Sequence, residues 1–333
     1  MDGTLMNEVY ASYAAGFTIA FLIALFLILY TLKRRSSSLH NYFILSMVSI
    51  AVWSFGSLIE FISPQLETKI LWAKFSYIGI STVAPFLFLF VISYVKGGKK
   101  VENYYVFLLM ILPAVITFLA FTNEWNGLIW TNITLVFTKG FYTAVYEHGP
   151  AFWTIIIYSY ALLSSAIIIL AYYLFNSSKF YRLPLGIIFL GIIFPFIFNV
   201  IYVSKLSSNN VDLTPISFAI TGIIAALGIF KFQILNIIPV AYTKLFKNMT
   251  NGFLIFDRDD RLLEINIAAQ KMFKINPNSI GKNFEDIFNK WSEFKSFYYN
   301  LNSNDREIFL DNPLNQWVEI QRTPLYNNEN ELS

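Results

Sequence analysis

The stretch YASYAAGFTIAFLIALFLILYTL, residues 10–32, decides the fold class, because it runs for 23 residues without a charged side chain. A helix that crosses the hydrocarbon core of a bilayer needs about 20 consecutive apolar residues. No basic segment precedes this stretch, and it is longer than the apolar region of a secretory signal peptide. We therefore expect residues 10–32 to form a retained membrane-spanning helix.

The amino-acid composition indicates that membrane-spanning segments make up most of the chain. Of 333 residues, 56% are hydrophobic and 14% are charged, and the mean hydropathy is +0.54. Soluble domains are about 45–50% apolar and about 25% charged, so a soluble enzyme is excluded. The chain has no cysteine and two histidines, which excludes disulfides, thiolate metal sites, cysteine nucleophiles and His-rich metal clusters.

Seven apolar runs are long enough to span a membrane, and they predict an all-α seven-helix bundle. They cover residues 10–32, 41–63, 70–95, 103–121, 151–175, 184–204 and 214–235.

The basic residues of the loops predict the orientation of the bundle, since cytoplasmic loops carry an excess of Lys and Arg. Only Lys69, Lys74, Lys139 and Lys205 fall on one side. The other side holds Lys33, Arg34, Arg35, Lys96, Lys99, Lys100, Lys179, Arg182, Lys231, Lys244 and Lys247. We therefore expect a multi-pass protein of the cell membrane with its N-terminus outside and residues 236–333 in the cytoplasm.

The long outer loop, residues 122–150, is rich in aromatic side chains. Such residues favour the depth of the lipid headgroups, so they predict an interface belt with a small β-hairpin. The alternative is a lid over a site for an apolar or aromatic small molecule. The candidate signal contacts are Trp125, Asn126, Trp130, Tyr142, Tyr158, Tyr160, Asn199 and Asp212.

Polar groups inside spans are costly and often functional. Glu60 ends the second span and Lys74 begins the third, so they are candidates for an intramembrane pair, either a structural ion pair or two side chains that reach the interface. Asn199 lies inside the sixth span, where an amide more often links helices than binds a ligand.

Three other classes of seven-helix protein fit the sequence less well. A retinal protein needs a lysine midway along the seventh span, whereas Lys231 lies near its cytoplasmic end, and the third span has no carboxylate counter-ion. A G-protein-coupled receptor would show an acidic-Arg-aromatic triplet after the third span, where this chain reads SYVKGG. A transporter would show internal repeats, and none occurs at a fixed offset.

The connector, residues 236–250, carries a short heptad seam of Ile238, Tyr242, Leu245 and Met249. The seam predicts either an amphipathic helix that packs against its own domain or a parallel helix that pairs with a second copy of the chain. We favour the homodimer, because the connector lies between the membrane part and the soluble part.

Residues 251–333 have ordinary polarity and predict a small α+β domain in the order strand, strand, helices, strand, strand. The expected strands cover 252–257, 262–266, 306–312 and 316–326, and the helices lie at 267–274 and 284–298.

This tail resembles a PAS sensor domain. The matching motifs are FD-x-x-x-x-L-x-x-IN-x-A-A at residues 256–269 and S-x-G-K-x-F-x-D-I at residues 279–287. The resemblance implies a fifth strand that closes the fold, often followed by an Asp-Ile-Thr motif and an output domain. The chain ends at Ser333 before that strand, so we expect a PAS-like domain that is cut short, as in a fragment, a piece made for expression or a broken reading frame.

The membrane part resembles the N-terminal seven-helix region of bacterial and archaeal sensor histidine kinases. The matching stretches are TNEWNGLIW (122–130), HGPAFWTIIIYSY (148–160), PFIFN (195–199), DLTPISF (212–218) and FKFQILNIIPVAY (230–242). Members of that family commonly carry histidines after the Trp of the outer loop. Here Asn126 and Gly127 stand there, which puts proton or metal sensing at that point in doubt.

The resemblance implies a receptor that relays a signal through the connector and the PAS-like domain to a histidine kinase of a two-component system, and so to a response regulator. A diguanylate cyclase sensor, a stand-alone receptor acting through partners and a transporter with a regulatory domain remain alternatives. No phosphoacceptor helix, ATP lid or GGDEF-type loop is present in these residues.

We expect no cofactor, because the chain has no cysteine for a flavin–thiol adduct and the tail has no histidine for haem. The expected partners are membrane lipid, a second copy of the chain, an output domain and an unknown small molecule, but no nucleic acid.

Overall fold

The computed structural model describes residues 3–33, 38–138, 141–177, 179–204, 211–232, 246, 248–257, 259–276, 279–289, 291–299, 305–310, 316–321 and 323. The chain divides into two compact units, Met1–Pro239 and Val240–Ser333.

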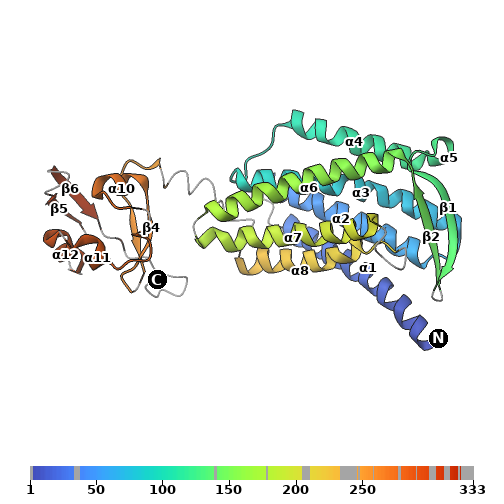
Figure 1. Ribbon diagram of the computed structural model, residues 1–333, viewed down its shortest axis with the longest axis horizontal. Helices are drawn as coiled ribbons and strands as arrows, with labels where there is room; N and C mark the ends of the chain where they lie inside the picture. The colour runs from blue at the N-terminus through green and yellow to red at the C-terminus, as the bar shows by residue number, and fades with distance from the viewer. Residues whose placement is uncertain are drawn as a thin grey trace. The chain divides into compact units, whose positions relative to one another are not determined.

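The first unit is a bundle of long apolar helices (Figure 1). Its helices are α1 (Gly3–Leu32), α2 (Ser38–Ile62), α3 (Leu66–Val95), α4 (Asn103–Phe121), α5 (Asn123–Asn126), α6 (Pro150–Asn176), α7 (Lys179–Val203) and α8 (Thr214–Phe232).

Six helices in the described part of the chain are long and apolar enough to cross a membrane, namely α1 to α4, α6 and α7. The seventh predicted span corresponds to α8, whose apolar part, Thr214–Phe230, is shorter. Its 19 residues would extend about 28 Å at 1.5 Å per residue, close to the thickness of the hydrocarbon core. The prediction of a multi-pass membrane protein is therefore confirmed.

Large apolar side chains cover the outer faces of several helices. Phe118 on α4 is 66% exposed, Ile168 on α6 is 68% exposed and Phe175 is 78% exposed. A protein surrounded by water rarely presents such broad apolar faces, whereas a helix in a bilayer does.

Helices α2 and α3 pack closely through small residues. A Cβ atom added at Gly79 of α3 would lie 2.3 Å from the Ser49 carbonyl oxygen of α2. The hydroxyl groups of Ser49 and Thr82 hydrogen-bond across the same interface at 2.8 Å. Small residues bring the two backbones together, as is common between membrane helices.

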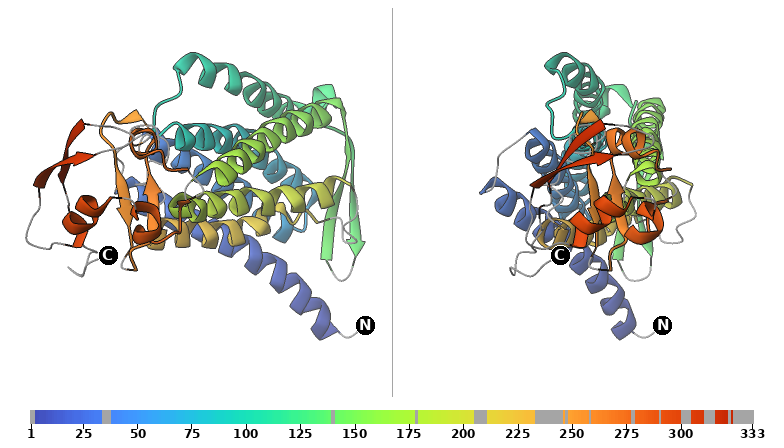
Figure 2. Two further views of the ribbon diagram at one scale, coloured as in Figure 1. Left: turned by 60° about the vertical axis from the view of Figure 1, so that its left-hand side comes forward. Right: turned by 90° about the vertical axis from the view of Figure 1, so that its left-hand side faces the viewer.

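A β-hairpin lies across one end of the bundle, the end at which the chain begins (Figures 1 and 2). Strand β1 (Trp130–Thr138) pairs antiparallel with β2 (Phe141–His148), with an irregular register between Trp130 and Asn132. Phe141 packs against Phe61 of α2 at a ring distance of 5.2 Å and against Tyr10 of α1 at 6.1 Å. The hairpin that the sequence predicts in the outer loop is therefore present, and it is packed onto the helices.

Within its described residues, the second unit contains two antiparallel strand pairs and three helices, in the predicted order. The strands are β3 (Leu254–Phe256), β4 (Leu262–Ile265), β5 (Asp305–Leu310) and β6 (Gln316–Gln321), and β3 pairs with β4 while β5 pairs with β6. The helices are α10 (Ile267–Phe273), α11 (Phe284–Phe288) and α12 (Ser292–Tyr299).

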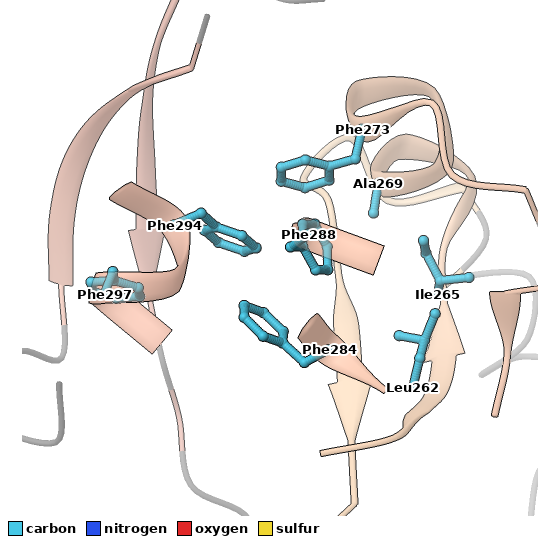
Figure 3. Packing of buried hydrophobic residues seen from close by; sticks show 8 residues of the cluster. All are labelled: Leu262, Ile265, Ala269, Phe273, Phe284, Phe288, Phe294 and Phe297. Carbon is cyan, nitrogen blue, oxygen red and sulfur yellow. The ribbon is translucent and has the colours of Figure 1, made fainter. Parts of the chain in front are cut away.

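Phenylalanine rings fill the core of the second unit (Figure 3). Phe273, Phe284, Phe288, Phe294 and Phe297 are all buried and come from all three helices. Asn266 caps α10 by accepting a hydrogen bond from the Ala269 N–H at 2.9 Å, which supports the helix directly after β4.

Candidate functional site

A cavity of about 110 Å³ lies under the hairpin, inside the first unit. Its walls come from α1, α2, α3, both hairpin strands, α6, α7 and the segment before α8. A single buried water needs roughly 10–15 Å³ measured in this way, so the space suits several waters or a small ligand. We call it the outer cavity.

The carboxylate of Glu60 links the bundle to the hairpin. Glu60 is the third residue from the end of α2, and its Oε1 accepts a hydrogen bond from the Tyr146 hydroxyl of β2 at 2.7 Å. This contact joins residues 86 positions apart in the chain. A change at Glu60 or at Tyr146 would therefore alter the contact between α2 and the hairpin.

Lys69 of α3 reaches the end of α2. Its Nζ donates to the carbonyl oxygen of Glu60 at 2.8 Å and to that of Phe61 at 3.2 Å. The last carbonyls of a helix lack partners within the helix and carry partial negative charge, so an ammonium group stabilises them. The charge of Lys69 is thus directed at the backbone of α2.

Asp212 lies in the segment before α8 and also lines the outer cavity. Its Oδ1 accepts a hydrogen bond from the backbone N–H of Thr214, the first residue of α8, at 2.9 Å. Burial raises the pKa of Asp212 to about 6, and the hydrogen bonds from Thr214 oppose that rise.

Aromatic rings form much of the wall. The ring of Trp130, which is 4% exposed, lies 5.2 Å from the rings of both Tyr77 and Tyr146. Burial and the neighbouring Glu60 raise the pKa of Tyr146 well above its ordinary value. Tyr146 therefore remains a neutral hydroxyl that can donate to Glu60.

Asn123 sets the position of the hairpin. Its Oδ1 accepts from the N–H groups of Ile129 at 2.9 Å and Trp130 at 3.0 Å, and its Nδ2 donates to the Trp130 carbonyl at 2.9 Å. Gly127, at φ 61°, supplies the left-handed turn that ends α5. Together these contacts bring Trp130 into the wall.

The expected pair of Glu60 and Lys74 is not formed. Lys74 instead forms an ion pair with Glu124 and donates to the Phe121 carbonyl at 3.3 Å. The hydrogen bond from Lys74 lowers the pKa of Glu124. Lys69 and Lys74 are five residues apart on one helix, which turns their side chains about 140° away from each other. Only Lys69 therefore faces the end of α2.

A second, smaller cavity of about 50 Å³ is lined by Tyr160, Asn199 and Thr214, among others. The Tyr160 hydroxyl donates to Asn199 Oδ1 at 3.0 Å, and Asn199 Nδ2 donates to the Thr214 hydroxyl at 3.3 Å. Asn199 thus joins α6, α7 and α8, as expected of an amide that links helices.

The predicted signal contacts fall into two groups. Trp130, Tyr142, Asn199 and Asp212 line the outer cavity, and Tyr160 lines the second one. The other three lie elsewhere: Trp125 is 88% exposed, Asn126 hydrogen-bonds within its own turn at the Thr122 carbonyl, and Tyr158 donates to the Leu109 carbonyl at 2.7 Å.

Several polar or aromatic residues of the outer cavity were not among the predicted signal contacts. They include Lys69, Tyr77, Tyr146, His148 and Tyr202. Lys69 and Tyr77 belong to α3, Tyr146 and His148 to the hairpin and Tyr202 to α7, and no spacing in the sequence relates these three elements. The only feature of the sequence that could have identified them is an aromatic or polar side chain near the end of a predicted span or on the hairpin.

The predicted connector seam lies only partly within the residues that the structure describes. Ile238, Tyr242 and Leu245 of the connector seam lie outside the residues that the structure describes, whereas Met249 is described and is 43% exposed. Within the described ranges, no three His, Asp or Glu residues gather in a way that would hold a metal ion.

Comparison with known proteins places the bundle in a family. The sequence model described as the N-terminal 7TM region of histidine kinase matches residues 17–239. Among solved structures, squid rhodopsin is similar, with 11% sequence identity, a TM-score of 0.47, and coverage of 68% of this chain and 83% of that chain. No curated protein matches the chain.

Proposed function

Since the chain belongs to the family of N-terminal 7TM regions of histidine kinases, we propose that its outer cavity detects a signal and that the bundle relays it to a kinase. The family indicates a membrane sensor, consistent with a kinase-linked receptor. The cavity as the sensing site, the route of relay and the output are parts of the proposal.

One observation carries the proposal most directly. The outer cavity joins elements that are far apart in sequence, and the Tyr146–Glu60 hydrogen bond ties the hairpin to α2 across it. A ligand that competes for this bond would change how the hairpin packs on α2. A receptor needs an element that can adopt two arrangements, and its ligand must bind one of them more tightly than the other.

The relay continues through α8 and the connector into the second unit. Asp212 lines the cavity and hydrogen-bonds the first residue of α8, so a change in the cavity reaches this helix directly. The connector follows α8 in sequence, and its heptad seam favours a parallel homodimer. The strand and helix order of the second unit supports a PAS-like relay.

The orientation and setting follow from the loop charges. We place the N-terminus and the outer cavity outside the cell, and the second unit in the cytoplasm with the response-regulator pathway. Lipid surrounds the apolar faces of the helices. Neither a cofactor nor a nucleic acid has a role in this proposal.

The first measurement is the DNA sequence downstream of codon 333. A reading frame that continues into a His-box and an ATP-binding domain would support the kinase. A GGDEF-type domain would favour the cyclase alternative, and an immediate stop codon would favour a receptor that acts through partners.

A functional test then uses the natural full-length protein in proteoliposomes. Tyr146→Phe removes the hydroxyl that donates to Glu60, and we expect it to change the rate of autophosphorylation from labelled ATP several-fold. Tyr104→Phe is the matched control, because Tyr104 is 64% exposed on α4. Equal rates for both variants and the unaltered protein would contradict the proposal.

The transporter alternative predicts a different result. Vesicles that contain the chain would accumulate a labelled solute above the level of empty vesicles. Uptake equal to that of empty vesicles counts against a transporter.

A further inference from the structure

The charges of the outer cavity do not balance. Among the described residues that line it, the carboxyl groups are Glu60 and Asp212 and the ammonium group is Lys69. The two carboxyl groups line the same cavity. The ammonium of Lys69 donates to two backbone carbonyls at the end of α2. With both carboxylates ionised and His148, which also lines the cavity, neutral, the cavity carries one net negative charge.

Both carboxylates keep acceptor capacity for a ligand. Tyr146 donates to Glu60, and the Thr214 N–H donates to Asp212. An ionised carboxylate offers about four acceptor sites, so each group has lone pairs left beyond these bonds.

A hydroxyl group in the wall also points to a ligand. The Oγ1 atom of Thr143 is buried and has no hydrogen-bond partner among the residues that the structure describes. Thr143 lies on β2 and lines the outer cavity. A buried polar atom without a partner is costly and uncommon in folded proteins, and a rotation of the Thr143 side chain would bring this hydroxyl to a molecule bound in the cavity.

The remaining wall is aromatic. Tyr77, Trp130 and Tyr146 form a continuous group of rings at 5.2 Å spacing, and Tyr202 and Phe152 line the cavity from α7 and α6. The face of an aromatic ring attracts a cation, most strongly for Trp, and the attraction grows when the cation loses its water.

We propose that the outer cavity binds a small organic ammonium ion, held by the carboxylates of Glu60 and Asp212 and by the rings of Tyr77, Trp130 and Tyr146. The proposal rests on the outer cavity as the sensing site and names the chemical class of its ligand. The cation neutralises the excess charge, and its alkyl groups contact the rings.

Other ligand classes fit this lining less well. An anion would face two carboxylates while the single ammonium group is already hydrogen-bonded. Glu60, Asp212 and His148 all line the cavity, but within the described ranges no three His, Asp or Glu residues are grouped so that they could hold a metal ion. A neutral molecule would leave the negative charge without a counter-charge in a buried site, which is unfavourable.

Choline is a suitable probe, because it combines a quaternary ammonium group with a hydroxyl. The purified chain in lipid nanodiscs is titrated with choline at about pH 8, where Asp212 is ionised, and binding is measured by calorimetry and by tryptophan fluorescence. The matched control ligand is 3,3-dimethyl-1-butanol, which has the same shape without the charge. We expect saturable binding of choline and at least about tenfold weaker binding of the neutral alcohol.

Three variants test the assignment of the carboxylates. Glu60→Gln and Asp212→Asn each remove one charge at nearly constant size, and each should weaken choline binding about tenfold or more. Glu147→Gln is the control, because Glu147 is an exposed acidic residue of the same hairpin that does not line the cavity. It should bind choline as the unaltered chain does.

The outcomes separate this inference from the proposed function. Equal affinity for choline and the neutral alcohol, or no binding of either choline or methylammonium, overturns the ammonium site. If Glu60→Gln does not fold, as judged by its melting temperature, the result for Asp212→Asn decides. An effect of Tyr146→Phe on kinase activity without choline binding would leave the proposed function standing and remove only the ligand class.

Discussion

Asn123 shows how much one polar side chain can decide in this molecule. It is buried, and it satisfies three backbone groups at the junction between α5 and β1. The hairpin begins at Trp130, and the ring of Trp130 forms the wall of the outer cavity. The position of the wall therefore depends on an amide that does not itself line the cavity.

We expect Asn123→Ala to lower the stability of the first unit by about 2–3 kcal/mol, because buried backbone groups lose their partners. Thermal unfolding in detergent measures the change, and hydrogen exchange at Ile129 and Trp130 locates it. Asn132→Ala is the control, since Asn132 is exposed on β1. Equal melting temperatures for both variants would refute this role of Asn123.

Asp212 leads to a prediction about pH. The pKa of Asp212 is raised to about 6, so its carboxyl is ionised above that pH and neutral below it. A cation prefers the ionised form. Choline affinity should therefore be highest at neutral to alkaline pH and fall as the pH drops through about 6.

Several other titratable or charged groups face Asp212 and must be considered in this experiment. They are Glu60 on α2, Lys69 and Tyr77 on α3, Tyr146 and His148 on β2, Tyr160 on α6 and Tyr202 on α7. Asp212→Asn should weaken binding and remove the pH dependence between about 5 and 7, whereas His148→Gln should retain it. A pH dependence that survives in Asp212→Asn would assign the titration to another group.

At the scale of elements, the α2–α3 pair is the rigid support of the site. Glu60 belongs to α2, Lys69 and Tyr77 belong to α3, and the two helices approach through Gly79 and Gly56. The apolar patterns of both spans were sufficient to predict the helices. Their closeness was not predictable, because an apolar sequence alone does not say which glycine meets which backbone.

Gly79→Ala should therefore destabilise the bundle by about 1–3 kcal/mol, since the new methyl group would meet backbone atoms of α2. Gly186→Ala on α7 is the matched control, because the nearest atom to its new Cβ is 4.0 Å away. We expect the control to melt at or slightly above the temperature of the unaltered protein. Melting temperatures in detergent compare the two, and equal values would contradict the close packing.

For the whole molecule, the orientation in the membrane can be measured directly, because the chain has no cysteine. Asn132→Cys lies on the hairpin and Lys99→Cys lies in the loop after α3, and both positions are exposed. A membrane-impermeant maleimide should label the first variant in intact cells and the second only after permeabilisation. The reverse pattern would invert the proposed topology.

The proposed homodimer is tested on the same scale. Leu245→Asp in the whole chain should shift the equilibrium towards monomer in sedimentation velocity, because a charge at a seam position is costly to bury. Lys244→Asp, one residue away and outside the seam, is the control. An unchanged dimer fraction in Leu245→Asp would remove the seam from the interface.

The sequence by itself determined the membrane location, the helical spans, the hairpin and the element order of the second unit. These properties depend on local hydropathy and spacing, which neighbouring residues report directly. Only the tertiary structure decided that Glu60 meets Tyr146, that Lys74 meets Glu124 and that Asp212 shares a cavity with Glu60 and Tyr146. The physical reason is that such contacts depend on the rotation of each helix and on segments far apart in the chain, such as Glu60 and Tyr146, which are 86 positions apart.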